Sequence, residues 1–460
     1  MGAATQPTST ARERWAWYLY DFGNSAYAAV VLLAVYSAYF QGTVAGNVEG
    51  GGSRLWGIAV GIAMFVVAVT APILGTLADF SGQKKRFLFV FTHLCILFTA
   101  MLFFVRAGNV LTGMLFFILA EIGYRASQVF YNSLLPEIAS QEEMPKISGN
   151  GWAIGSFGGI ICLLIVLGAI ILLGDDGRRV LSSGMIVRLS LIFTAIYFAV
   201  SALPSWFWLS EKAKKNALPK EETYLSLAFK RLGRTFRSVR TFREFIKFII
   251  AFLIYNDGIL MVLDFGAILG AVLYGMGQQE LIIFMIIVQV TSVAGAYLFG
   301  LMADRFGGKR SLVVSLLMMI VPVVWLYFSR AKLEFYIIGG IAGFALTGVQ
   351  SVSRTVAGMF APQGKSAEFY GFFAVAGRTS SFIGPPIFGL LTGVLIKRNI
   401  NLLGMDPAQA EVMAHRLAVF SILIFLVVGL GLLLTVNEAR AKEAARAREE
   451  DVDAVPVAAK

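Results

Sequence analysis

The chain has 460 residues, of which 57% are apolar and only 15% are charged, and its mean hydropathy is +0.74. A soluble domain of ordinary composition carries about a quarter charged residues, so this composition excludes a water-soluble globular protein. The formal net charge of +11 would suit a nucleic-acid-binding protein, but the positions of the basic residues give it a different meaning.

Apolar runs long enough to cross the roughly 30 Å hydrocarbon core of a bilayer recur along the whole chain. The sequence therefore predicts an all-α membrane protein with twelve transmembrane helices in two six-helix halves. In chain order, the predicted spans are residues 18–40, 55–78, 87–105, 110–131, 149–173, 186–208, 244–268, 280–302, 311–328, 334–357, 369–396 and 413–436. The predicted domains are an N-terminal half (1–208), a cytoplasmic linker (209–243), a C-terminal half (244–436) and a cytoplasmic tail (437–460).

Lysine and arginine are unevenly divided between the two sides of the predicted membrane. The loops on the side of both termini and the linker carry about three times as many as the loops on the other side. Because cytoplasmic loops hold the excess of basic residues in membrane proteins, both termini and the linker are predicted to be cytoplasmic. Topology thus accounts for the positive charge, and no nucleic-acid partner is expected.

The linker carries a second pattern. Arginines recur every three residues, and apolar residues recur at spacings of three and four. The residues are Arg231, Arg234, Arg237, Arg240 and Arg243, and Leu225, Phe229, Leu232, Phe236 and Val239. This pattern predicts an amphipathic helix that binds anionic lipids of the cytoplasmic leaflet. A solvated connector between the halves is an equally compatible alternative.

One loop motif occurs twice, at equivalent places in the two halves. Gly75, Asp79 and Gly82 lie between spans two and three, and Gly300, Asp304 and Gly307 lie between spans eight and nine. Both copies read Gly-x-x-x-Asp-x-x-Gly and are followed by basic residues, 225 residues apart. The second glycine of each copy suits a tight turn. Each aspartate could meet the positive N-terminus of a neighbouring helix, so we expect these loops to latch one conformation.

The paired loops resemble the signature of the major facilitator superfamily, whose halves are parallel repeats. Further segments resemble one of its branches, the vacuole effluxer family: Tyr20–Tyr27, Tyr131–Glu137, Tyr255–Gly258 and Gln350–Arg354, the last continuing into Glu368–Arg378. The resemblance covers about residues 15–436 and implies a transporter; the family includes a fungal autophagy-linked exporter of amino acids. Fungal members usually carry a longer central insertion. This compact chain resembles a bacterial member, which would lie in the inner (plasma) membrane.

Polar residues form a stripe on the fourth predicted span: Glu121, Arg125, Gln128 and Asn132. Their offsets of 0, 4, 7 and 11 place them within about 60° of arc on a helix. An ionisable side chain deep in a membrane is costly and calls for a partner or a function. Glu121 and Arg125 can neutralise each other as an i, i+4 pair, so the stripe predicts either a structural ion pair or part of a substrate cavity.

Spans one and seven carry carboxylates at matching places. Span one has Asp21 and Asn24, and span seven has Asn256, Asp257 and Asp264. A glycine beside each set is expected to loosen the helix and free backbone groups to line a cavity. A buried carboxylate there could take up and release a proton, with Asp257 favoured. In the alternative interpretation, Asp21 lies at the interface and caps the first helix.

The second half adds Gln350 and Arg354 in span ten and Arg378 in span eleven, which Pro385 and Pro386 are expected to bend. A guanidinium stays charged in any environment, so these arginines must be paired with acids or bind an anionic group. An amphoteric substrate such as an amino acid needs both signs of charge. Arg125, Arg354 or Arg378 could hold its carboxylate, and Asp21, Asp257 or Glu121 its ammonium group.

The sequence contains no nucleotide-binding loop and no spacing typical of metal ligands, so no metal, cofactor or enzymatic activity is expected. His93 and His415 are interpreted as residues without a functional role. We therefore predict a monomeric secondary transporter that moves a small polar solute, with an amino acid suspected and protons as the coupling ion. The alternatives are an exporter or flippase of an amphiphile, lipid or drug, and a non-transporting membrane receptor or scaffold.

Overall fold

The computed structural model describes residues 10–48, 51–139, 144–173, 182–210, 242–360 and 383–444, together with Gly233, Phe369, Phe372, Phe373, Ala376 and Gly377. For residues 71–72, 75–81, 136, 144–146, 148–149, 183 and 304 it describes the backbone alone. The predicted amphipathic linker helix and Arg378 lie outside the described residues.

The regular elements of the described residues are all helical. In chain order they are α1 (Ala11–Tyr27), the π-helix η1 (Ala28–Ala34), α2 (Tyr36–Tyr39), the π-helix η2 (Phe40–Val44), α3 (Gly52–Ser81), α4 (Lys84–Met101), the 3₁₀-helix η3 (Leu102–Phe104), α5 (Val110–Ile138), α6 (Met144–Leu173), α7 (Ser183–Trp208), α9 (Arg243–Tyr274), α10 (Gln278–Phe306), α11 (Gly308–Phe328), α12 (Lys332–Met359), α14 (Gly384–Leu403) and α15 (Pro407–Leu434). The all-α fold class is confirmed.

Eleven helices of the described chain are long and apolar enough to cross a membrane, with α1 to η2 counted as one span of 34 residues. Each coincides with a predicted span. The predicted span 369–396 falls partly outside the described residues, and its described part belongs to α14, which is not among the eleven. The chain is therefore a multi-pass membrane protein.

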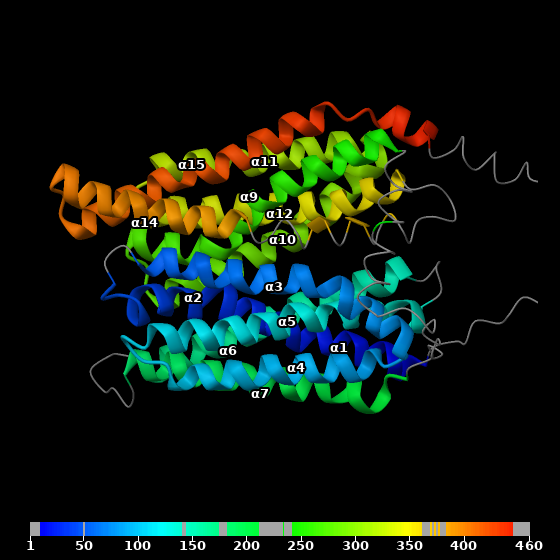
Figure 1. The fold of residues 1–460 in the computed structure, drawn as a ribbon, viewed down its shortest axis with the longest axis horizontal. Helices are drawn as coiled ribbons and strands as arrows, with labels where there is room; N and C mark the ends of the chain where they lie inside the picture. Colours follow the sequence, from blue (N-terminus) through cyan, green and yellow to red (C-terminus); the bar gives the residue numbers. More distant parts are fainter. Residues whose placement is uncertain are drawn as a thin grey trace, which may run out of the picture.

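The helices run roughly side by side in two groups (Figure 1). One group holds α1 to α7 and the other α9 to α15, and α3 packs against α14 where the groups meet. The start of α1 and the end of α15 lie at the same end of the bundle. We call this the termini end and the opposite one the far end. The predicted domain boundaries stay a prediction.

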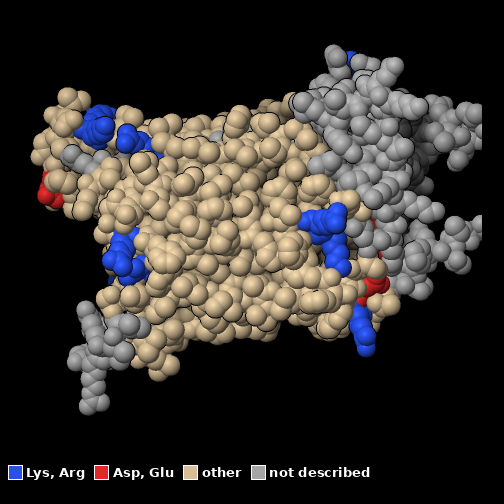
Figure 2. Space-filling view, turned by 60° about the horizontal axis from the view of Figure 1, so that its bottom comes forward, with Lys and Arg blue, Asp and Glu red and all other residues tan. Residues whose placement is uncertain are grey.

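The outer surface is suited to lipid. On the face shown in Figure 2, a broad band without charged residues separates the two ends, where lysines and arginines gather. Large apolar side chains such as Phe157, Val394 and Ile424 are exposed. In water this much exposed apolar surface would favour aggregation, whereas acyl chains solvate it.

The turns at the repeated loops depend on glycine. Gly82 ends α3 with φ of 57°, and Gly307 separates α10 from α11 with φ of 94°. Residues with a Cβ rarely adopt positive φ, which explains why both copies of the motif end in glycine. The tight turns expected from the motif are present at both positions.

Two expectations about helix geometry are wrong. Helix α9 is continuous through Asn256 and Gly258, and α1 continues past Asn24 to Tyr27. Gly258 instead provides a close contact, because a Cβ there would lie 3.1 Å from the side chain of Leu426 on α15. The departures from α-helix in the first span come later, at η1 and η2.

Pro385 and Pro386 also act differently from the expectation. They occupy the first turn of α14, which begins at Gly384. Proline is well tolerated there, because the first N–H groups of a helix have no partner within the helix. In the described residues, the two prolines therefore start a helix rather than bend one.

Candidate functional site: a polar cavity between the two halves

At the far end the two halves are in close contact along α3 and α14. A Cβ on Gly57 would lie 2.5 Å from the carbonyl oxygen of Pro385, and a Cβ on Gly389 would lie 2.6 Å from that of Ser53. Real Cβ atoms do not approach other atoms so closely, so this crossing requires glycine on both helices. The crossing closes the space between the halves at the far end.

Hydrogen bonds between the halves reinforce this closure. The indole Nε1 of Trp56 on α3 donates to the backbone oxygen of Asp264 on α9 at 3.0 Å. Gln278, at the start of α10, donates to the backbone oxygen of Val35 at 3.0 Å. A third set of hydrogen bonds, between side chains only, joins η2 and α3 to α15. The far end is thus sealed by directional contacts as well as by packing.

Closer to the termini end, a cavity of about 200 Å³ lies between the halves. Its lining residues come from α3, α5, α9 and α12 and from the segment before α14. They are Met64, Val67, Arg125, Gln128, Phe252, Asn256, Leu260, Gln350, Arg354, Phe373 and Gly377. Gln350 and Arg354 are exposed. Five of the predicted site residues therefore share one cavity, although they come from three helices in both halves.

The predicted ion pair on α5 is present. Arg125 Nε donates to Glu121 Oε1 at 2.7 Å, and the hydroxyl of Tyr27 on α1 donates to Glu121 Oε2 at 3.0 Å. The Glu121 side chain is fully buried, whereas 23% of the Arg125 side chain is exposed. Glu121 is therefore an internal counter-charge that lies behind the cavity. Arg125 reaches the cavity while it is held by that counter-charge.

The three candidate proton sites differ in their contacts. Asp257 Oδ1 accepts the N–H of Gly384 at 3.0 Å, so Asp257 caps the start of α14. Asp264 is buried, and neither of its carboxylate oxygens has a hydrogen-bond partner among the described residues. Its electrostatic neighbours across the halves are Arg125 and Glu121. An unpartnered buried carboxylate calls for an explanation, so Asp264 stays a candidate proton site.

Asp21 lies in the middle of α1, so the alternative that it caps the first helix is wrong; Thr10 is the N-cap. Asp21 faces α6, where a Cβ on Gly155 would lie 2.6 Å from its Oδ2. Asn24 is hydrogen-bonded to Asp21 and is buried, with its Oδ1 unpartnered among the described residues. These two residues do not line the cavity. Asn132, the last residue of the predicted stripe, is exposed and does not line it either.

Comparison with known proteins identifies the family to which this chain belongs. The sequence model of the family described as "Vacuole effluxer Atg22 like" matches residues 56–446. The chain belongs to this family. An uncharacterized MFS-type transporter of Bacillus subtilis, YxiO, is 30% identical over 92% of this chain and 94% of its own length. Autophagy-related protein 22 of the fungus Coccidioides immitis is 23% identical over 72% of this chain and 66% of its own length.

Solved structures agree on the fold. A bacterial homologue of the human lysosomal transporter Spinster, solved in an inward-facing and unoccupied conformation, has a TM-score of 0.71. The match covers 96% of this chain and 99% of that one at 14% identity, which supports a shared fold alone. The major facilitator fold is confirmed, and both the family and the fold are those of transporters.

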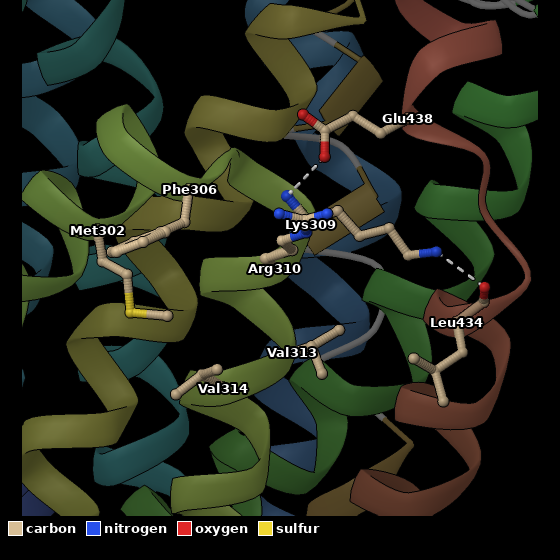
Figure 3. Close-up of a pocket in the computed structure, with 8 residues that line it drawn as sticks. All are labelled: Met302, Phe306, Lys309, Arg310, Val313, Val314, Leu434 and Glu438. Atoms are coloured by element: carbon tan, nitrogen blue, oxygen red, sulfur yellow. Dashed lines mark hydrogen bonds between the residues drawn. The ribbon is translucent and has the colours of Figure 1, made fainter.

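The repeated loops are described only in part, because the side chains of Asp79 and Asp304 are not described. At the second copy, the carboxylate that meets the start of α11 comes from Glu438, which accepts the backbone N–H of Lys309 at 3.2 Å (Figure 3). Lys309 Nζ donates to the backbone oxygens of Leu434 and Val436 at the end of α15. The loop is thus joined to the last helix, a contact that the sequence did not indicate.

Proposed function

We propose that this effluxer-family chain is a secondary transporter that binds a small carboxylate-bearing solute, with an amino acid as the first candidate. One observation carries the proposal: Arg125 from the first half and Arg354 from the second both line the cavity between the halves. Guanidinium groups suit planar carboxylates because they donate several N–H groups in a fixed geometry. The amides of Gln128, Asn256 and Gln350 in the same cavity offer oxygen acceptors for an ammonium group.

The size of the cavity supports a small solute over an amphiphile. Pockets for drug-sized ligands measure roughly 300–1,000 Å³, and this cavity measures about 200 Å³. A lipid or drug would need a larger and more apolar groove, and the groove of about 730 Å³ shown in Figure 3 is lined by the second half alone. A non-transporting receptor would have no need of a far end that is closed by hydrogen bonds between movable halves. The cavity and the closed far end together favour alternating access.

The charge distribution of the loops supports an orientation with both termini in the cytoplasm of a bacterial cell. In that orientation the cavity lies toward the cytoplasm and the seal toward the outside, as in the inward-facing state of a transporter. Anionic lipids are the expected partners of the linker helix.

A binding assay on the purified protein tests the solute class. Thermal shift and titration calorimetry would compare amino acids with their methyl esters and with the amines that lack the carboxylate. We expect the acids alone to bind and to stabilise the protein. A charged hydrogen bond contributes about 1.5–3 kcal/mol, so Arg354→Gln should weaken binding by roughly 10- to 150-fold.

The matched control is Arg398→Gln, which removes an exposed arginine of α14 that does not line the cavity. It should leave the affinity unchanged. Esters that bind as tightly as the acids, or an Arg354→Gln variant with unchanged affinity, would contradict the proposed carboxylate site.

A further inference from the structure

Four buried or half-buried polar side chains form a continuous chain across the far end. Gln41 on η2 and Ser53 on α3 belong to the first half, and Glu411 and His415 on α15 belong to the second. Gln41 Nε2 donates to Glu411 Oε1 at 2.8 Å, and Ser53 Oγ lies 2.9 Å from Gln41 Oε1 and 2.6 Å from His415 Nε2. His415 is fully buried, and its Nδ1 lies 2.8 Å from the backbone oxygen of Glu411. We call these residues the far-end cluster.

Donor counting in the far-end cluster indicates an extra proton. Nδ1 of His415 faces a carbonyl oxygen, so it must carry hydrogen. If Nε2 is bare, the single hydroxyl proton of Ser53 is donated to it, and Gln41 Oε1 loses that donor. If His415 is protonated at both nitrogens, every contact is satisfied in one direction: Nε2–H donates to Ser53, Ser53 to Gln41, and Gln41 to Glu411.

The charge of the far-end cluster leads to the same result. With Glu411 ionised and His415 neutral, the cluster carries a single negative charge on a half-buried carboxylate. One added proton brings the net charge to zero, whether it resides on the imidazole or on the carboxyl group. A charge that is partly removed from water without a counter-charge is costly, so a cluster with no net charge is the more stable one in the closed state.

Charged groups on the neighbouring elements do not replace this proton. Toward the far end they are Arg54 on α3, Asp264 on α9, Lys397 and Arg398 on α14, and Arg416 on α15, with Asp406 at the N-cap of α15. Arg416 donates instead to the backbone oxygens of Leu326, Tyr327 and Ser329. Among the described residues, neither Glu411 nor His415 forms an ion pair with any of these groups.

We propose that the far-end cluster is a proton-binding site that holds one proton when the far end is closed and releases it when the far end opens. Opening separates the two pairs, because Gln41 and Ser53 move with one half and Glu411 and His415 with the other. Water then solvates Glu411, and the requirement for zero net charge disappears. The inference rests on the proposed alternating access, because it needs a far end that opens.

The sign of the pH dependence follows from linkage. The closed state binds more protons than the open state, so raising the pH favours opening. For a single proton, the ratio of closed to open molecules should fall by up to about tenfold per pH unit.

Spin labels on cysteines at Thr43 and Asn401, both exposed at the far end on opposite halves, would report this ratio. Distance distributions of the purified protein would be measured from pH 5 to pH 9 without ligand, after replacement of the buried Cys95 and Cys162. We expect the long-distance population to grow with pH. Glu411→Gln, which is neutral at every pH, should stay closed throughout. Glu280→Gln, at a surface ion pair with Lys332 near the same end, should respond as the parent protein does.

A Ser53→Ala variant provides a second test that does not alter a titrating group. It interrupts the chain between Gln41 and His415, so its closed population at pH 5 should fall toward the parent's value at high pH. Opening that is independent of pH, or that responds to pH equally in Glu411→Gln, would overturn the proton site alone. A distance that never changes, even with a bound solute, would overturn alternating access as well.

Discussion

Removal of both members of the Glu121–Arg125 pair separates a structural role from a binding role. Arg125→Met alone would leave Glu121 as a buried charge without its 2.7 Å partner, at a cost of about 3–5 kcal/mol. The double variant Glu121→Gln, Arg125→Met removes both charges. The introduced glutamine could still accept the hydroxyl of Tyr27, which lies 3.0 Å from the carboxylate that is replaced. We therefore expect the free energy of unfolding of the double variant to change by no more than about 1 kcal/mol.

The expected effect on binding is larger. Arg125 bonds Glu121 through Nε, and no hydrogen bond from the described residues occupies its two terminal nitrogens, which are therefore open to a ligand in the cavity. Loss of a charge-assisted hydrogen bond costs about 1.5–3 kcal/mol, equivalent to a roughly 10- to 150-fold rise in Kd. Thermal unfolding without ligand and calorimetric titration with the bound amino acid would measure the two quantities separately.

A second ion pair in the same half provides the control. Lys84 and Glu137 lie 2.7 Å apart near the termini end and do not line the cavity. Lys84→Met with Glu137→Gln should leave the affinity unchanged. If the Glu121/Arg125 double variant binds with its original affinity, Arg125 has a structural role only, and the anion site is left to Arg354 and Arg378.

Three further outcomes are expected. Asp264→Asn should abolish accumulation driven by a pH gradient in proteoliposomes and keep solute exchange at equal pH; the same behaviour in Asp257→Asn, with coupling retained in Asp264→Asn, would assign the proton to Asp257. Gly57→Val should shift the far-end distance distribution toward open states, because its side chain would overlap the carbonyl of Pro385; an unchanged distribution would show that the crossing tolerates bulk. Asp79→Asn should slow transport with affinity retained within a few-fold, and a proportional loss of affinity would argue against a latch.

The sequence predicted the spans well because a bilayer leaves a chain few choices: each backbone polar group in lipid must be bonded within a helix. It also predicted the Glu121–Arg125 pair, whose spacing of four is visible in one helix. The hydrogen bonds of the far-end cluster could not be predicted in this way. Gln41 and Glu411 are 370 residues apart, and Ser53 and His415 are 362 apart. His415 was accordingly interpreted as uninformative.

Contacts between residues far apart in the sequence also explain why the structure of the Asp257 site differs from the prediction. Its sequence neighbours Asn256 and Gly258 suggested a loosened helix beside a buried carboxylate that exchanges protons. Its partner is the N–H of Gly384, 127 residues away, and Gly258 packs against α15. Tyr27, in contrast, carried a usable signal: Asp21, Asn24 and Tyr27 recur every three residues on α1, which places their side chains along one face. Of these residues, Tyr27 contacts Glu121 of the α5 stripe, whereas Asp21 lies against Gly155 of α6.

The cavity and the closed far end share two helices, and this suggests how one could control the other. Helix α9 carries Asn256 at the cavity and Asp264 at the contact with Trp56, eight residues or about 12 Å along one unbroken helix. Helix α3 of the other half likewise carries Met64 at the cavity and Gly57 at the crossing with α14. A solute that draws Arg125 of α5 and Arg354 of α12 together would also move α3 and α9, because α3 packs against α5 and α9 packs against α12. Because α3 and α9 each extend from the cavity to the far end, closure around the solute would separate Gly57 from Pro385 and open the far end.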